Sequence, residues 1–253
     1  MANSTIDPIG DEFFQPLLRA EKVADSLFYG SAFLSIASLI IDPKGWPSAN
    51  DAAQTLFVFS VLTLFITNSI IRLYLFPRAQ QGRVEDFLSH AFDKPLSHKR
   101  TEAYYNNSAT NPSSRIAAQV LESSFFSKEI LSMMAWKYRA TIVLYTVAFA
   151  TAVIYRRTDL AWIGVGAQIL FSEQVLSRYI RYEWFKKECE QIYKALSRLF
   201  QTKADLKIPS VEFLTRYENV KATAALSLSS KVFAEERHRL SEEWEAVRRT
   251  IGL

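Results

Sequence analysis

The sequence predicts an all-α polytopic membrane protein, with four transmembrane helices in two hairpins and a helical cytosolic domain. Three observations support this fold class. Four apolar blocks alternate with strongly charged stretches, although only 49% of the 253 residues are hydrophobic. One of these blocks, Leu56 to Ile71, contains no charged residue. The chain has only 7 Gly and 8 Pro, which argues against disorder and against a turn-rich β fold.

The first hairpin is predicted from two apolar segments, Leu27–Ile41 and Thr55–Phe76. The second segment is long enough to cross a bilayer core, which takes about 20 residues. The first is shorter, and its extension to nearly that length includes Asp25. Residues 42–47 contain two prolines and a glycine and predict the connecting turn. We expect Pro77 to end the second helix, because proline lacks the amide hydrogen that a helix interior uses.

The second hairpin is predicted from Ala140–Tyr155 and Leu160–Leu176. No proline or turn cluster separates the last segment from the charged residues that follow it. We therefore expect one continuous helix from Asp159 to Phe200, which would be about 63 Å long at 1.5 Å per residue. Since a bilayer core is about 30 Å thick, the second half of this helix would project into water.

These boundaries divide the chain into four parts. The parts are an N-terminal amphipathic helix with the first hairpin (1–76), a cytosolic helical insert (77–139), the second hairpin (140–176) and a cytosolic helical tail continuous with the fourth span (177–253). Lys and Arg are concentrated in the insert and the tail. The positive-inside rule therefore predicts that both of these parts, and the N-terminus, lie in the cytoplasm.

Within the insert, Arg83–Phe92 predicts a short helix and Asp93–Ser113 predicts a loop. We expect Ser113 or Ser114 to cap the next helix, and Ser127 to cap a further helix that leads into the third span.

Two apolar stripes recur at helical spacing in the tail. We interpret the first either as a self-association seam or as a face that packs on the chain's own helix at 210–250. Its members are Phe185, Cys189, Ile192, Leu196 and Leu199. The second stripe predicts a terminal amphipathic helix, with Leu240, Trp244, Val247 and Ile251.

Motifs of catalysis, cofactor binding and metal binding are absent from the sequence. It has no Gly-rich phosphate loop and no HExxH, CxxC or GxSxG pattern, so we expect neither an enzyme nor a cofactor. His90 and His98 flank Asp93, but a metal site needs further ligands, so we interpret them as solvated loop residues. The net charge of +4 suggests contact with anionic lipid. We do not expect nucleic acid, because no motif interleaves aromatic and basic residues.

Polar side chains inside the apolar blocks are the first candidate site, because such groups are costly in lipid. At 1.5 Å per residue, Arg72 and Glu173 each lie about 5–6 Å below the cytoplasmic boundary, and Asn68 and Gln168 about 12 Å below it. The matched depths predict two pairs along one side of an oligomeric pore or gate. The alternatives are ordinary interhelical hydrogen bonds, or an arginine that reaches lipid phosphates. Further candidate lining groups are Thr63 and Thr67.

The second candidate site is the loop sequence Tyr104, Tyr105, Asn106 and Asn107. Adjacent tyrosines and amides can stack on a planar ligand and hydrogen-bond to it. They can equally attach a loop to the helices beside it. Both interpretations stay open.

The layout of two short-loop hairpins, a cytosolic insert and a long helical tail resembles that of the SMODS-associated four-transmembrane effector family. Shared local sequence lies at Arg83–Phe92, directly after the second span, and from Ile208-Pro209 to Tyr217, after the long helix. Those bacterial proteins are encoded in anti-phage operons beside cyclic-nucleotide signalling enzymes and are regarded as permeabilising the inner membrane. Other small four-helix membrane components of phage defence share the layout.

The resemblance implies a multi-pass protein of the bacterial inner membrane, and the charge distribution predicts cytoplasmic termini. The leading hypothesis is an oligomeric effector that forms a pore, or otherwise disrupts the membrane, on a cytosolic trigger. A defence protein or a nucleotide second messenger would be that trigger. The alternative is a non-conducting anchor that recruits a cytosolic partner protein. An effector should collapse the membrane potential, whereas an anchor should only co-purify with its partner.

Overall fold

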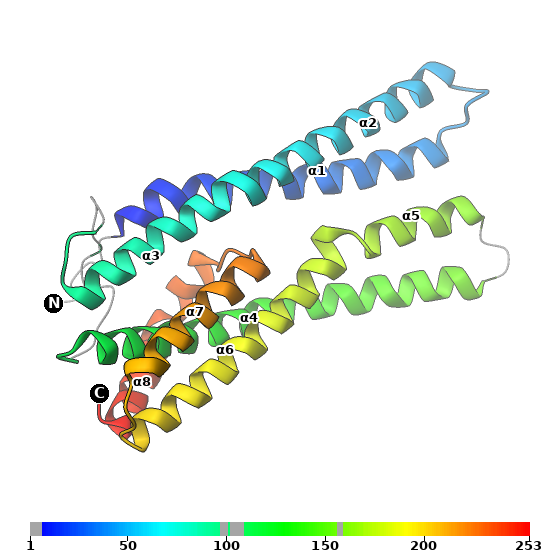
Figure 1. The fold of residues 1–253 in the computed structure, drawn as a ribbon. Helices are drawn as coiled ribbons and strands as arrows, with labels where there is room; N and C mark the ends of the chain where they lie inside the picture. The colour runs from blue at the N-terminus through cyan, green and yellow to red at the C-terminus, as the bar shows by residue number, and fades with distance from the viewer. Residues whose placement is uncertain (1–6, 97–100, 102–108, 156–158) are drawn as a thin grey trace. The chain divides into compact units, whose positions relative to one another are not determined.

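The computed structural model describes residues 7–96, 101, 109–155 and 159–253 (Figure 1). All regular elements in these ranges are helices, which confirms the all-α class. The chain forms two compact units, and each is described by itself. Unit 1 contains Met1–Gln15, Phe76–Trp136 and Arg181–Leu253, and unit 2 contains Pro16–Leu75 and Lys137–Ile180.

Unit 2 consists of two helical hairpins (Figure 1). The first hairpin is formed by α1 (Gln15–Ile40) and α2 (Pro47–Ile70), and α2 leads into a π-helical turn, η2 (Ile71–Leu75). The second hairpin is formed by the C-terminal part of α4 (Pro112–Ile154) and the short α5 (Leu160–Leu170). A further π-helical turn, η3 (Glu173–Ser177), leads from there into α6 (Arg178–Gln201).

The buried Asn50 holds the turn of the first hairpin. Its side-chain amide donates hydrogen bonds to the carbonyls of Ser38 (3.0 Å) and Ile41 (3.2 Å) at the end of α1. The last carbonyls of a helix have no partner within the helix, so these bonds satisfy groups that would otherwise lack one. Gln54 donates in turn to the Asn50 side-chain oxygen at 2.7 Å. This network sets the register of α1 against α2.

Within the ranges that the structure describes, three helical segments are long and apolar enough to cross a membrane, namely Gly10–Ile40, Pro47–Phe92 and Pro112–Ile154. The middle segment exposes large apolar side chains over several successive turns, and Phe59 and Phe65 are 63% and 70% exposed. An exposed apolar surface of this kind is typical of contact with lipid or with another protein. Length and composition therefore favour a membrane protein.

The predicted fourth span, Leu160–Leu176, is not one continuous helix. The helix α5 has only 11 residues, which is about 16 Å at 1.5 Å per residue and roughly half of a bilayer core. The prediction of a single helix from Asp159 to Phe200 is therefore wrong, because α5, η3 and α6 follow one another with an interruption after α5.

Ser172 marks this interruption and supplies its physical reason. Its backbone is extended, with ψ at 161°. Its hydroxyl donates a hydrogen bond to the Ile169 carbonyl at 2.8 Å. A serine that bonds to a nearby backbone carbonyl competes with helical hydrogen bonding. Neither glycine nor proline is needed for such an end, and for this reason the sequence pattern does not reveal it.

The helices α2, η2 and α3 (Phe76–Phe92) form one uninterrupted rod, so the prediction that Pro77 ends the helix is wrong. A proline ring normally crowds the carbonyl four residues earlier and leaves it without a donor. Here that carbonyl belongs to Leu73 and lies in η2, where hydrogen-bond partners are shifted by one residue. The wider π-helical turn accommodates the proline.

The helix α4 is a single helix of 43 residues where the sequence predicts two. Asn111, and neither Ser113 nor Ser114, caps its first turn, because the Asn111 side-chain oxygen accepts the Ser114 backbone N–H at 2.8 Å. Ser127, the predicted cap of a second helix, lies inside α4. Its hydroxyl is hydrogen-bonded to the Tyr217 hydroxyl at 2.9 Å, so a buried side chain is its partner.

An aromatic and aliphatic core organises unit 1, which includes α7 (Lys207–Ala224) and α8 (Ser230–Ile251). The Phe125 ring of α4 lies 5.5 Å from the Trp244 ring of α8 and 5.8 Å from the Tyr193 ring of α6, between ring centroids. Fully buried aliphatic side chains fill the same core, and they include Leu121, Leu131, Ile192, Leu196 and Leu240. The core therefore joins α4, α6 and α8.

Both apolar stripes of the tail are buried in this unit. Four members of the first stripe are at most 2% exposed, namely Phe185, Cys189, Ile192 and Leu196. Arg216 of α7 donates a hydrogen bond to Glu188 of α6 at 2.8 Å, so α7 packs beside this helix. The stripe is covered by its own chain, and its interpretation as a self-association seam is wrong. The predicted terminal helix corresponds to α8, with Leu240, Trp244 and Ile251 buried.

The N-terminal residues of unit 1 pack against α3. Arg83 donates two hydrogen bonds to the Asp7 carboxylate, at 2.8 and 3.1 Å. The π-helical turn η1 (Gly10–Phe14) follows Asp7 and places Phe13 over α3. A Cβ atom at Gly82 would lie 3.2 Å from the Phe13 ring, so a glycine at this position permits the close approach.

Candidate functional site

Two ion pairs connect the hairpins of unit 2. Arg178, the first residue of α6, donates two hydrogen bonds to Asp25 of α1, at 2.7 and 3.0 Å. Arg72 of η2 donates one to Glu173 of η3, at 2.5 Å. We call the four residues of these pairs the inter-hairpin charge cluster; they are Asp25, Arg72, Glu173 and Arg178. Each pair contains one residue from the first hairpin and one from the segment that follows α5.

The Asp25–Arg178 pair is the more enclosed of the two. The Arg178 side chain is 18% exposed and that of Asp25 is 36% exposed. Burial alone would lower the pKa of Arg178, but the hydrogen bonds to Asp25 outweigh it and keep the pKa above its ordinary value. Tyr138 of α4 also interacts with the Arg178 guanidinium. A single charged side chain therefore joins residues from α1, α4 and α6.

The Arg72–Glu173 pair is more open, with side chains 50% and 37% exposed. In water such a pair contributes little to stability. Beside lipid, an unpaired charge is far more costly, so pairing is favoured there. Each residue lies in a π-helical turn. Such turns are rare in proteins, and those that occur often lie at functional sites. This pair is therefore the stronger candidate for a moving contact.

The two residue pairs that the sequence matches by depth have different outcomes. Arg72 and Glu173 are in direct contact. Asn68 and Gln168 form no hydrogen bond with each other in the part of the chain that the structure describes. Asn68 is half-buried and Gln168 is exposed. A role of these four residues in lining a pore stays a prediction.

The remaining predicted site residues add little to the cluster. The Thr63 hydroxyl donates to the Phe59 carbonyl of its own helix at 2.8 Å, so a local partner satisfies it. Thr67 is half-buried in α2. The candidate loop Tyr104–Asn107 lies outside the described residues.

The Asp25–Arg178 pair is not predicted from the sequence, although one signal for it exists. Asp25 is an acidic residue within a segment that is otherwise apolar enough to cross a membrane. An ionisable side chain in such a segment usually has a partner. Its partner could not be identified, because Arg178 lies 153 residues away and only the tertiary fold brings it near.

Unit 1 contains a buried polar cluster of Asp86, Thr101 and His90. The Asp86 carboxylate accepts the Thr101 backbone N–H at 2.9 Å and the Thr101 hydroxyl at 2.7 Å, and Asp86 is fully buried. His90 lies 3.0 Å from the Thr101 hydroxyl and 3.5 Å from Asp86. Burial would raise the pKa of Asp86, but the hydrogen bonds from His90 and Thr101 outweigh it and hold the pKa below its usual range.

This cluster corrects the interpretation of His90 as a solvated loop residue. His90 lies in α3, its side chain is only 16% exposed, and it contacts two buried residues. The second histidine of that interpretation, His98, lies outside the described residues. Among the described residues, no group of three or more His, Cys, Asp or Glu is placed to hold a metal ion. The polar cluster therefore anchors Thr101 to α3.

A partly buried ion pair of α7 interacts electrostatically with the chain's single cysteine in unit 1. Cys189 of α6 is fully buried, and this burial raises the pKa of its thiol. Burial also lowers the pKa of Lys221 on α7, although Glu218 binds its ammonium at 3.0 Å. A thiol with a raised pKa is a poor nucleophile, so this group favours a structural role for Cys189.

Over the described residues the fold defines a class: an all-helical protein that has three segments able to cross a membrane and that divides into two compact units. No protein family, curated protein or solved structure matches the chain. The function is therefore proposed from this chain's own sequence and geometry.

Proposed function

We propose that this protein is a membrane effector of the bacterial inner membrane that permeabilises the bilayer on a cytosolic trigger. The inter-hairpin charge cluster carries the proposal. Two arginine–carboxylate pairs lie between helices whose surfaces are otherwise strongly apolar. Charged groups in such segments usually mark a pathway for ions, protons or water. A simple anchor needs the apolar helices but has no need of the charges.

The proposed effector acts as an oligomer. Arg72 and Glu173 retain half and more than a third of their side-chain exposure in one copy. In a bilayer these atoms would contact hydrocarbon unless several copies direct them toward a shared interior. One copy has too few helices to enclose a wide channel, so the conducting path would form between copies. Thr67 and Asn68 precede Arg72 on the same rod and are further lining candidates.

The trigger is proposed to act through unit 1, in the cytoplasm together with both termini. The excess of Lys and Arg in the insert and the tail supports this orientation. The helix α6 begins with Arg178 and continues into the buried core of unit 1 at Phe185 and Cys189. A ligand that shifts α6 would therefore disturb the Asp25 pair. The resemblance to the SMODS-associated effectors suggests a defence protein or a nucleotide second messenger.

Ion flux tests the proposal. The full chain is overproduced in bacteria while a voltage-sensitive dye reports the membrane potential, and the purified protein is reconstituted in vesicles loaded with a self-quenched dye. Because the proposed effector acts as an oligomer, we expect high protein density to assemble it without the trigger, with loss of potential in cells and dye release that rises more steeply than linearly with density. Lys44→Glu, in the exposed turn of the first hairpin, is the matched charge control and should behave like the wild type. An intact potential together with tight vesicles would refute conduction.

A second candidate function is a non-conducting anchor, and one observation favours it. Ile208 and Val211 lie one turn apart on α7 and are 79% and 58% exposed in unit 1. Exposed apolar side chains on a folded unit can bind a partner protein. Ile208→Asp with Val211→Asp should then abolish co-purification of that partner, while the membrane potential is the same with and without the substitutions.

A further inference from the structure

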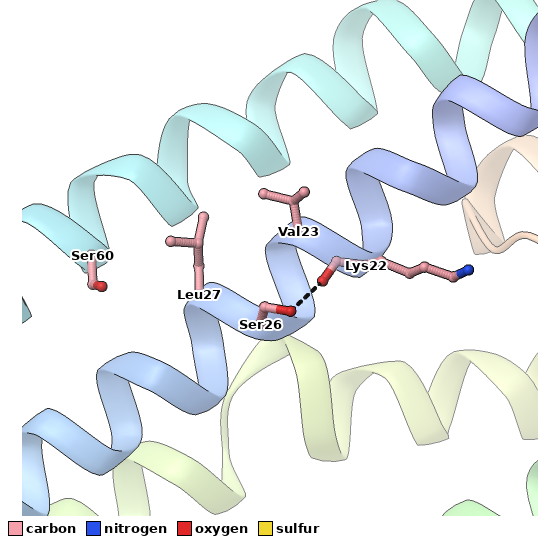
Figure 2. Close-up of a pocket in the computed structure, with 5 residues that line it drawn as sticks. All are labelled: Lys22, Val23, Ser26, Leu27 and Ser60. Carbon is pink, nitrogen blue, oxygen red and sulfur yellow. Dashed lines mark hydrogen bonds between the residues drawn. The ribbon is translucent and has the colours of Figure 1, made fainter.

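A groove with a volume of about 340 Å³ lies between α1 and α2 in unit 2 (Figure 2). This volume is within the range of small-molecule sites, roughly 300–1,000 Å³. Val23 and Leu27 point from α1 toward α2, and Ser60 approaches them from α2, as Figure 2 shows. The remaining lining residues are Lys22 and Ser26. The groove is mostly apolar and open along one side.

Open space continues along α1 beyond Leu27. Gly30 lies on the same helix face as Val23 and Leu27, because residues at i, i+4 and i+7 align. A Cβ atom at Gly30 would meet no other atom within 4 Å. The face from Val23 to Gly30 is about 10 Å long at 1.5 Å per residue. It is an apolar surface that a linear hydrocarbon chain can cover.

The N-terminal end of the groove carries positive charge. Lys22 and Arg19 are exposed and one turn apart, and neither has an ion-pair partner in the ranges that the structure describes. Asp25, one turn beyond Lys22 on α1, already binds Arg178 through both of its oxygens. The hydroxyl of Ser26 donates to the Lys22 carbonyl at 2.9 Å. The apolar groove therefore ends at Lys22, with Arg19 one turn before it on α1.

We propose that this groove holds one acyl chain of an anionic phospholipid, with the lipid phosphate at Lys22 and Arg19. From Lys22 to the end of α1 the helix is about 27 Å long at 1.5 Å per residue. That length nearly matches a hydrocarbon core of about 30 Å, so Lys22 lies near one membrane boundary. Basic side chains at that depth reach lipid phosphates. The site requires helices in a bilayer but does not require conduction.

Native mass spectrometry tests the site. The purified full chain in detergent receives equal amounts of phosphatidylglycerol and phosphatidylethanolamine with identical acyl chains. We expect a one-to-one complex that prefers phosphatidylglycerol. Lys22→Gln should weaken its binding about fivefold, the factor for one basic residue at an anionic surface. Gly30→Leu should fill the groove and reduce the retention of both lipids. Leucine is a better helix former than glycine, so lower retention would not come from a weakened helix.

Matched variants keep the test specific. Lys44→Gln removes an exposed lysine at the other end of the same hairpin. Gly164→Leu adds the same side chain at a glycine of α5 that also has open surroundings. Both should retain phosphatidylglycerol like the wild type, and circular dichroism melting verifies that every variant is folded.

Three results would overturn the proposal. Equal retention of the two lipids, or equal losses in the control variants, would show that Lys22 does not select a phosphate. Displacement of the lipid by glycerol phosphate at equal concentration would show that the groove adds nothing to binding. A change in the dimer fraction of Gly30→Leu without a change in lipid retention would show that a second copy of the chain fills the groove.

Discussion

Asp25 and Arg178 lie 153 residues apart in the sequence and form a two-bond ion pair in unit 2. The planar guanidinium fits a carboxylate with two parallel hydrogen bonds, which gives the contact a defined direction. The Arg178 side chain is largely enclosed, at 18% exposed, so loss of Asp25 leaves its charge without compensation, whereas loss of both partners does not. The pair therefore links the first hairpin to the start of α6 more specifically than apolar packing can.

Asp25→Asn is expected to lower the free energy of unfolding by roughly 2–3 kcal/mol, because it strands the Arg178 charge. The effect should stay below that of a fully buried pair, since Asp25 is 36% exposed. Chemical denaturation in detergent, followed by circular dichroism, measures it. The double variant Asp25→Asn with Arg178→Gln should lose less free energy of unfolding than the two single variants lose in sum. Purely additive losses would mean that the two side chains do not interact energetically.

Charge reversal tests the Arg72–Glu173 contact. Arg72→Glu and Glu173→Arg each place two like charges side by side, at a cost of roughly 1 kcal/mol or more, which corresponds to at least about a fivefold change in an equilibrium. We expect each single variant to shift the rate of vesicle dye release by that factor or more. The double variant restores opposite charges and should return near the wild-type rate. If both single reversals change the rate and the double reversal recovers nothing, the contact is not a functional pair.

Asp86 is expected to make unit 1 sensitive to acid. Its pKa is lower in the folded protein than in the unfolded chain, so its stabilising contribution is complete above the unfolded value near 3.9 and is lost as the pH falls through the folded value. Asp86→Asn should cost roughly 2 kcal/mol at pH 7, because Thr101 loses a charged acceptor. Melting temperatures from pH 3 to pH 7 measure both effects.

In that experiment the variant should lose less stability than the wild type below about pH 4. Asp11→Asn, an exposed carboxylate of the same unit, is the control and should keep the wild-type profile. Parallel profiles for the wild type and Asp86→Asn would contradict the lowered pKa.

Patterns with a fixed period are predictable from this sequence, whereas local departures from regular helix are not. The apolar block at Leu56–Ile71 and the stripe through Trp244 report buried or lipid-facing surfaces, because helical periodicity acts along the chain itself. Ser172 ends a helix with its own hydroxyl, and Pro77 follows a turn that is widened to a π-helix. Both outcomes depend on backbone geometry that residue type alone does not specify.

One pair of the inter-hairpin charge cluster is predictable from the sequence and the other is not. Arg72 and Glu173 are predictable as partners because depth in a membrane can be counted in residues. The depths of Asp25 and Arg178 cannot be compared in this way. The helix is interrupted after α5, so counting residues does not give the depth of Arg178, which follows the interruption. The buried cluster of Asp86 is not predictable either. Its partner Thr101 lies in the predicted loop Asp93–Ser113, where no regular period fixes which residue a side chain meets.

Cys189 gives a measure of core integrity in unit 1, because it is the only cysteine in the chain. Burial raises the pKa of its thiol, so little reactive thiolate is present at neutral pH. We expect a disulfide reagent at pH 7.5 to react with the folded protein at least about 100-fold more slowly than with the protein in guanidinium, since each pKa unit changes the thiolate fraction about tenfold. Absorbance of the released thiol follows the reaction.

Leu196→Ala opens a cavity in the same buried stripe, at a cost of roughly 2–5 kcal/mol, and should accelerate labelling. Equal rates in the folded and the unfolded protein would show that the stripe is not covered by its own chain.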